Sequence, residues 1–296
     1  MYAADAVLYA VWEKKVVPPT ATIKGATVSL GQALGITYNA VVENTTSIPV
    51  MKFTVGEGTA IMTAEVEGVY NASNGRYYFE LTGVTPQRLG DNILAEVYVD
   101  GVQLAVKDDY SIRTNLTTQA GKTSTPEALK TLIYNTLAYG AAAQVVTGHR
   151  TDRMINADYE HLVTSYDMGA TSGADQGFAI NNTRSDVKIS GVSVNFGDVN
   201  KIMVQYVGEG ATLYINGNVA EATLKDGKYT FYTEGIYASE LGKVYTFTLK
   251  FDGEVVSTLT YSVNAYSARQ QGKDTDNAKL ATALFNYGMA AKAYIG

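Results

Sequence analysis

The chain has 296 residues, enough for two domains that each bury a hydrophobic core. Its 23 basic and 29 acidic residues give a net charge of -6 without any block of like charges, so nucleic acid is not expected as a partner. The chain has no cysteine, which excludes disulfides, thiolate metal sites and cysteine nucleophiles. No run of about 18 apolar residues occurs, so we expect no membrane insertion within this segment.

The first 19 residues predict a strand stub followed by a linker. Residues 6–12 read as a strand, and Pro18-Pro19 marks the linker because consecutive prolines extend the chain and donate no ladder hydrogen bonds. The motif Leu8-Tyr9-Ala10-Val11-Trp12 resembles the closing strand of Listeria–Bacteroides type surface repeats. That resemblance implies a preceding module, so we expect this chain to be a piece of a longer protein.

Short alternating segments, separated by Gly and Asn, follow along the chain. They predict strands at residues 36–42, 50–55, 77–81 and 93–99, with Asp100-Gly101 as a hairpin turn. Several short strands at this spacing indicate a β-sandwich or barrel. We therefore expect a first repeat at residues 20–148, made of a β-sandwich and a closing helix.

The closing helix is predicted from Thr125 to Gly148, with a second copy ending at Gly296. Apolar residues at helical spacing form one stripe, Thr125 is a candidate N-cap and the glycines are candidate C-caps. Small residues at 140–143 and 288–291 leave room for a close neighbour, and we expect a β-sheet to pack there. The fold class is thus mainly β with one helix per repeat, arranged as two tandem antiparallel β-sandwich-plus-helix domains.

Residues 149–171 are predicted to be an ordered connector with a short helical turn, and residues 172–296 a second repeat. The connector is polar with a few apolar anchors and lacks the Gly, Ser and Pro richness of a free tether. Both histidines of the chain, His149 and His161, lie in it without ligand-like spacing. We expect them to be solvated, with neither a metal nor a catalytic base.

An internal duplication supports the two repeats. A shift of 152 residues without gaps gives 12 identities in the 47 positions from 55 to 101, including Val55-Gly56-Glu57-Gly58 on residues 207–210 and Asp100-Gly101 on residues 252–253. The closing helices align with a shift of 148 residues. The duplication also predicts which strand positions face the core, because apolar residues share one parity in both copies. These positions are Ile93, Ala95, Val97 and Val99, with Tyr245, Phe247, Leu249 and Phe251.

Tyrosine is the abundant aromatic residue, with 22 copies against 8 of Phe and 1 of Trp. Tyrosine suits both strands and binding surfaces, because its large ring freezes few rotors. Four tyrosines fall on the outward parity of the expected strands and are the candidate ligand-binding residues: Tyr78, Tyr98, Tyr214 and Tyr232. The alternative is that these rings only cover the sheets or meet the neighbouring domain.

The sequence shows no constellation typical of catalysis. Asp108-Asp109 and Asp274-Thr275-Asp276 resemble carboxylate pairs, but they lie at element boundaries where capping and solvation explain acidic residues. A Gly-x-Ser-x-Gly elbow does not occur. We therefore expect no catalytic residue, no metal and no cofactor, and predict that the chain is not an enzyme.

The helix motifs at residues 139–144 and 285–294 resemble the NYGAAAQ-type helices that close tandem modules in very large secreted or wall-attached proteins of gut Firmicutes. Residues 154–158 and an expected strand at residues 261–266 fit the same type of module. The resemblance implies an extracellular or cell-wall location. Some such proteins resemble superantigens that bind immunoglobulin variable domains, although no ligand-contact motif carries over to individual residues here.

The leading hypothesis is a non-enzymatic extracellular binding module of a bacterial surface protein, an adhesin whose partner is a host protein, with immunoglobulin as the first candidate. A carbohydrate-binding module is one alternative, although the lone Trp lies at residue 12, outside the repeats. A passive spacer or stalk repeat is the other alternative.

Overall fold

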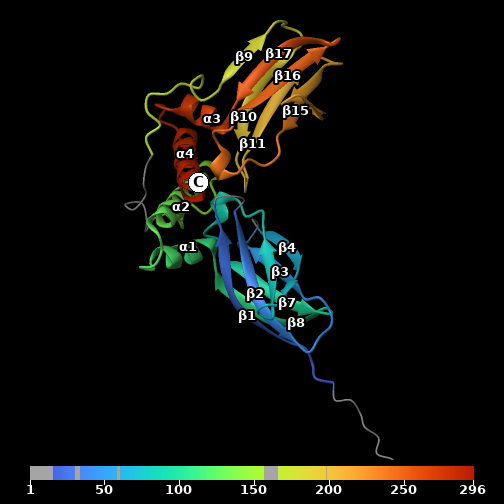
Figure 1. Ribbon diagram of the computed structural model, residues 1–296, viewed down its shortest axis with the longest axis vertical. Helices are drawn as coiled ribbons and strands as arrows, with labels where there is room; N and C mark the ends of the chain where they lie inside the picture. Colours follow the sequence, from blue (N-terminus) through green and yellow to red (C-terminus); the bar gives the residue numbers. More distant parts are fainter. Residues whose placement is uncertain (1–15, 31–33, 59–60, 157–165, 198) are drawn as a thin grey trace, which may run out of the picture.

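A computed structural model describes residues 16–30, 34–58, 61–156, 166–197 and 199–296 (Figure 1). Within these residues the chain forms two sandwiches, each made of two antiparallel sheets, and the sandwiches lie at opposite ends of an elongated molecule. The long helices lie together between them, beside the C-terminus. The structure confirms the predicted fold class.

The first repeat contains two four-stranded sheets and ends in helices. One sheet has the order β1 (Thr20–Ser29), β2 (Gly35–Glu43), β6 (Arg76–Leu81), β5 (Val69–Asn71). The other has the order β4 (Met62–Glu67), β3 (Val50–Val55), β7 (Ile93–Val99), β8 (Val102–Tyr110). Between β6 and β7 lies a short 3₁₀ turn, η1 (Pro86–Arg88). Helices α1 (Ile112–Ala120) and α2 (Glu127–Thr147) follow β8.

The second repeat has the same architecture. One sheet has the order β10 (Lys188–Asn195), β11 (Lys201–Val207), β15 (Lys228–Tyr232), β14 (Thr223–Lys225). The other has the order β13 (Asn218–Ala220), β12 (Thr212–Ile215), β16 (Tyr245–Phe251), β17 (Glu254–Tyr261), β9 (Ala179–Asn182). The turn η3 (Ala238–Glu240) and helices α3 (Val263–Gln270) and α4 (Asp276–Ile295) complete it.

Strand register fixes which residues of the two repeats correspond. Tyr38 pairs with Phe79, and Val204 pairs with Phe231, so β2 corresponds to β11 with a shift of 166 residues (204 − 38). The shift of 152 holds from β6 through the hairpin after β7. In both hairpins Asp and Gly have positive φ, at Asp100-Gly101 and at Asp252-Gly253. This is the type I′ geometry that the Asp-Gly pairs predict.

The structure corrects one part of the predicted alignment. Val55 ends β3 in one sheet of the first repeat, whereas Val207 ends β11, the counterpart of β2 in the other sheet. The Val-Gly-Glu-Gly identity therefore joins strands that do not correspond in space. The remaining 8 of the 12 identities lie between residues 75 and 101, where the two copies agree in topology.

The predicted core parity is confirmed in β7, where Ile93, Ala95, Val97 and Val99 are all buried. In the second copy Phe247 and Leu249 are buried, while Tyr245 and Phe251 are half-buried. The two sheets of each sandwich meet through aromatic rings. Tyr38 contacts Phe53 with centroids 5.5 Å apart, and Phe231 contacts Phe247 at 6.4 Å.

The helix boundaries differ from the prediction at three points. Thr125 does not cap α2, which has Pro126 at its N-cap, and the Thr125 hydroxyl donates instead to Gln119 O at 2.6 Å. Each repeat has a short additional helix, α1 or α3, before its closing helix. The expected strand at residues 261–266 is wrong because Ser262 caps α3 by accepting from Ala265 N at 3.0 Å. Thr275 caps α4, and Gly148 ends α2 with φ 65°, as the sequence indicates for helix ends.

The small residues of the closing helices contact the 3₁₀ turns, which corrects the expected contact with a sheet. A Cβ on Gly140 would lie 2.8 Å from Pro86 O, and a Cβ on Gly288 would lie 2.5 Å from Leu241 Cδ1 and 3.1 Å from Ala238 O. The glycines thus let α2 and α4 approach η1 and η3 by the same contact in both repeats.

Helices α2 and α4 also pack against each other and join the repeats into one continuous core. Tyr139 and Tyr287 stack with ring centroids 5.5 Å apart, and Tyr139 donates to Asn200 Oδ1 at 3.2 Å. Residues 16–19 have no regular structure, as a linker predicts, whereas the predicted strand at residues 6–12 lies outside the described residues. No helix of the described part has the length and apolar character needed to cross a membrane.

Candidate functional site

The four candidate tyrosines lie on four different sheets. Tyr78 is in β6 and Tyr98 in β7, so they lie on the two opposite outer faces of the first sandwich. Tyr214 in β12 and Tyr232 in β15 have the same relation in the second sandwich. The structure therefore does not bring the four rings together into one surface.

Three of these rings have local partners. Asn74 donates to the Tyr78 hydroxyl at 2.8 Å. The ammonium groups of Lys52 and Lys250 lie 5.0 Å and 4.8 Å from the ring centroids of Tyr98 and Tyr214, in cation–π geometry. Tyr232 is the most exposed of the four, at 46 %.

Tyr232 borders a depression of about 630 Å³ on the outer face of β11, β15 and β14. The floor is a row of cross-strand neighbours, in which Gln205 pairs with Thr230 and Thr230 pairs with Thr223. Met203 and Tyr232, themselves a cross-strand pair, form the apolar end. The opposite end is the β14–β15 hairpin, which contributes Lys225, Asp226 and Lys228.

The residues that line the depression differ from their counterparts in the first repeat. By strand register, the floor residues Gln205, Thr230 and Thr223 correspond to Asn39, Tyr78 and Val69 of the first repeat. The first sandwich thus has a tyrosine, Tyr78, at the position of Thr230 in the second. At the rim the aromatic ring is in the second repeat instead, since Tyr232 corresponds to Glu80 of the first.

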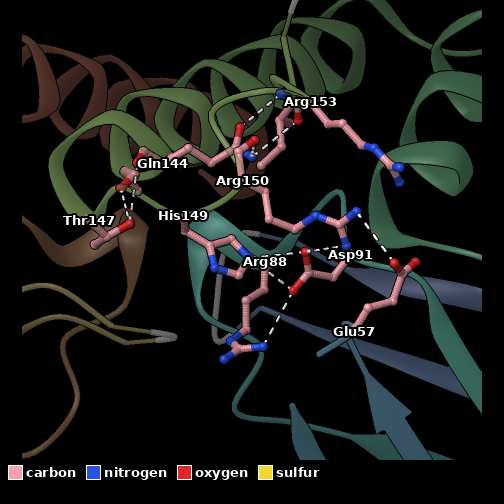
Figure 2. A network of polar contacts seen from close by, with 10 residues as sticks. Glu57, Arg88, Asp91, Gln144, Thr147, His149, Arg150 and Arg153 are labelled. Carbon is pink, nitrogen blue, oxygen red and sulfur yellow. Dashed lines mark hydrogen bonds and ion pairs between the residues drawn. The ribbon is translucent and has the colours of Figure 1, made fainter. Parts of the chain in front are cut away.

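A buried carboxylate marks a second polar feature, where the connector meets the first repeat (Figure 2). Asp91 is 2 % exposed, and His149 Nε2 lies 3.0 Å from both of its oxygens. Arg88 Nη1 lies 3.4 Å from one oxygen and Arg150 Nη1 lies 4.0 Å from the other. Arg150 also faces Glu57 at 3.8 Å.

The connector is held beside this carboxylate by the end of α2. The Gln144 side chain accepts from Ile155 N at 2.9 Å and donates to the carbonyls of Arg150 and Arg153 at 3.4 Å and 3.3 Å. Ile155 is fully buried, with its Cδ1 against Gly140. Together these contacts fasten residues 149–155 to the first repeat.

The expectation that His149 is solvated is wrong, because its side chain is only 12 % exposed and contacts Asp91. Sequence reasoning missed the pair because its members are 58 residues apart and meet only after α2 folds back on η1. His161 lies outside the described residues. Among the described residues no group of three or more His, Asp or Glu side chains is placed to hold a metal ion.

The acidic residues of the two suspected carboxylate pairs are all exposed. Asp109, at the end of β8, pairs with Lys107 at 2.6 Å, and this hydrogen bond lowers the pKa of the exposed carboxyl. Asp276 begins α4 directly after its cap, where a negative charge is favourable. Asp274 lies 3.7 Å from Lys279 on the surface.

Comparison with known proteins adds no family assignment. No protein-family model matches the chain, and a search of curated proteins finds no significant match.

Proposed function

We propose that the chain is a non-enzymatic binding module of a bacterial surface protein, located outside the cell or attached to its wall, and that its partner is a host protein. The observation that supports this proposal is the depression beside Tyr232. It combines an exposed aromatic ring and a methionine at one end with charged groups at the other, on the outer face of a sheet. Aromatic and Met side chains are enriched where proteins recognise proteins.

Immunoglobulin is the first candidate partner. The reason is the resemblance of the closing helices to modules of gut Firmicutes, some of which resemble superantigens for immunoglobulin variable domains. A glycan is the alternative that the site itself favours, because Tyr232 could stack on a sugar ring above the polar floor of Gln205 and Thr230. A passive spacer is the third reading, supported by the helix-to-helix packing that joins the repeats end to end.

A pull-down from serum and mucin, with biolayer interferometry of the intact chain against polyclonal IgA, IgM and Fab fragments and a soluble glycan panel, tests these readings. The leading proposal predicts binding to Fab or another serum protein. Binding to glycans with none to any Fab would favour the carbohydrate reading. Absence of binding to serum proteins, mucin and glycans would leave the spacer.

Two variants locate the site. Thr230→Tyr fills the depression with the ring that the first repeat has at Tyr78, and Tyr232→Ala removes the exposed ring. Both should weaken binding at least about tenfold, the effect of losing one interface anchor. Tyr98→Ala and Tyr214→Ala, on the other sheets, are matched controls for an outward tyrosine. If alanine at all four tyrosines leaves binding unchanged, the site lies elsewhere.

A further inference from the structure

The depression beside Tyr232 has an apolar end and a basic end. Tyr232 and Met203 form the apolar end, and Lys225 and Lys228 lie beside each other at the basic end. Lys228 and Tyr232 are four residues apart on β15 and face the same side of the sheet, so their Cα atoms are about 13 Å apart. A ligand that contacts both ends must therefore be elongated.

The two lysines of the basic end are an unfavourable pair in the protein alone. They are direct cross-strand neighbours on either side of the Asp226-Gly227 turn, and like charges placed opposite each other destabilise a sheet. Within the described part of the chain neither lysine forms an ion pair, unlike Lys52, which pairs with Glu65 at 2.8 Å. An anionic group on a ligand would offset this repulsion.

The first repeat has no equivalent of this basic end. By strand register, Lys225 and Lys228 correspond to Asn71 and Arg76. Arg76 Nη1 donates to Asn39 Oδ1 at 3.0 Å, so the one cation of the first repeat is already bound by the sheet. The lysine pair and the exposed aromatic ring thus occur together on this face of the second sandwich, and not at the corresponding positions of the first.

Between the two ends the floor of the depression offers hydrogen-bonding groups. Gln205 Nε2 donates to Thr230 Oγ1 at 3.4 Å, which leaves the Gln205 amide its oxygen and a second N–H, and leaves the Thr230 hydroxyl its hydrogen. Thr223 adds a further hydroxyl. The centre of a protein–protein contact is apolar, whereas amide and hydroxyl groups match the hydroxyl groups of a sugar. The floor therefore favours a carbohydrate over a polypeptide as the group that lies in the depression.

We propose that the depression binds an acidic oligosaccharide, with a terminal carboxylated sugar at Lys225 and Lys228 and an uncharged sugar stacked on Tyr232. The hydroxyl groups between these two ends bond to Gln205 and Thr230. An oligosaccharide is required because a single sugar ring does not cover the distance of about 13 Å between the ends. The inference rests on the proposed function, since it names the part of the host partner that the depression contacts, the glycan of a host glycoprotein.

Titration of the intact, ¹⁵N-labelled chain with sialyllactose, followed by NMR, tests the proposal. This trisaccharide has one carboxylated sugar at its end and two neutral sugars, and it should shift the amide signals of Thr223, Lys228 and Thr230. Its methyl ester keeps every hydroxyl group but has no charge, so it should bind at least about tenfold more weakly. Added salt should weaken binding of the acid and leave binding of the ester unchanged.

Substitutions at the basic end should change the affinity in opposite directions. Lys225→Gln and Lys228→Gln should each weaken binding of sialyllactose about tenfold, because each removes a charged donor. Asp226→Asn should strengthen binding, because it removes a negative charge beside the carboxylate, and Asn-Gly suits the type I′ turn as well as Asp-Gly does. Lys250→Gln, on the outer face of β16, is the matched control and should leave the affinity unchanged. Tyr232→Ala should weaken binding of the acid and the ester alike.

Three outcomes would overturn the inference. They are absence of binding to sialyllactose, equal affinity for the acid and its methyl ester, and equal affinity of the unmodified chain and the variant with both lysines replaced by Gln.

Sialidase treatment of serum and mucin separates this inference from the proposed function. Capture of a host protein that survives the treatment would uphold the proposed function and place the contact on polypeptide, which would overturn the inference. Capture that the treatment abolishes would support both. Binding of sialyllactose without capture of any serum protein or mucin would support the site described here and contradict a host-protein partner.

Discussion

Tyr139 and Tyr287 occupy the same position of the duplicated helix, and their rings stack on each other with planes 14° apart. A contact between equivalent residues is the arrangement that an approximate two-fold axis through the contact would produce. The symmetry is broken at the hydroxyl of Tyr139, which donates to Asn200, because the counterpart of Asn200 is Leu34 and has no side-chain acceptor. The repeats are thus joined by one aromatic pair whose two members are not interchangeable.

Tyr139→Ala should destabilise the chain by about 3–5 kcal/mol, as expected for deleting a fully buried aromatic ring. It should also separate the unfolding of the two repeats, because the stacked pair lies at their junction. Differential scanning calorimetry should then resolve two transitions where the unmodified chain shows one. Tyr237→Ala, at a position 40 % exposed, is the control and should cost far less.

Alkaline pH should weaken the same junction. Burial raises the pKa of the Tyr139 phenol, and the neighbouring Tyr287 adds to the rise. The unfolded chain therefore loses this proton first, near pH 10, while the folded chain retains it. The stability linked to Tyr139 is fully present below about pH 10 and falls as the pH rises from there toward the folded-state pKa.

Tyr139→Phe removes this linkage and also removes the hydrogen bond to Asn200, at a cost of about 1 kcal/mol at neutral pH. Urea midpoints measured between pH 7 and pH 11.5 should therefore fall less steeply in the variant than in the unmodified chain. Tyr232→Phe, at an exposed position, should leave the slope unchanged. Parallel slopes for Tyr139→Phe and the unmodified chain would contradict the buried phenol.

Local patterns predicted the elements whose signals lie within a few residues. The alternation of Ile93, Ala95, Val97 and Val99 predicted β7 with its bounds and its buried face. Helix α3 was missed because residues 261–266 also alternate, and only the cap at Ser262 distinguishes a helix start there. Side-chain periodicity over so short a segment does not decide between the two.

Features that depend on how distant strands and helices pair could not be predicted from the sequence. The depression beside Tyr232 requires knowing that Thr230 lies between Gln205 and Thr223 across three strands. The Asp91–His149 contact requires the fold of α2 onto η1. An alignment without gaps likewise could not show that Val55 and Val207 end strands of different sheets.

Replacing glycines of the closing helices by alanine tests their contact with the 3₁₀ turns. An exposed glycine and a closely packed glycine predict changes in stability of opposite sign. Replacing an exposed helical glycine by alanine normally stabilises a helix by about 0.8–1 kcal/mol. Gly140→Ala should instead destabilise by about 1–3 kcal/mol, because the new Cβ would lie 2.8 Å from the Pro86 carbonyl oxygen, which belongs to the backbone.

Gly288→Ala should behave in the same way, with Leu241 Cδ1 at 2.5 Å. Gly121→Ala is the control, since this residue has φ -70° and its nearest contact would be an ordinary 3.5 Å. Guanidinium unfolding midpoints give the comparison. A stabilising Gly140→Ala would mean that α2 does not contact η1 closely.

The predicted domain division can be tested with fragments. Residues 16–156 keep the whole first-repeat part of the continuous core, including both sheets of the first sandwich and α2, so this fragment alone should unfold cooperatively. A fragment ending at Gly148 should be less stable by about 2–5 kcal/mol, because it lacks Ile155, which is fully buried against Gly140. Equal urea midpoints for the two fragments would show that the connector adds nothing to the first repeat.

Arg88 and Asp91 correspond to Glu240 and Lys243 through the shift of 152, with the sign of each charge inverted. This charge reversal predicts how the connector is held. Arg88→Glu with Asp91→Lys gives the first repeat the ion-pair orientation of the second, so the pair itself is preserved. Arg150 would then face a like charge, and the His149 ring would lose its carboxylate partner, so residues 149–155 should leave the surface of the first repeat.

Limited trypsin digestion detects that release, because cleavage after Arg150 and Arg153 requires the connector to leave the surface. The double variant should be cut at these sites at least about tenfold faster than the unmodified chain, with its sandwiches intact by near-UV circular dichroism. Glu240→Arg with Lys243→Asp makes the same exchange in the second repeat, which holds no such segment among its described residues, and should leave the rate unchanged. Equal cleavage of all three proteins would mean that Ile155 and Gln144 hold the connector without the carboxylate.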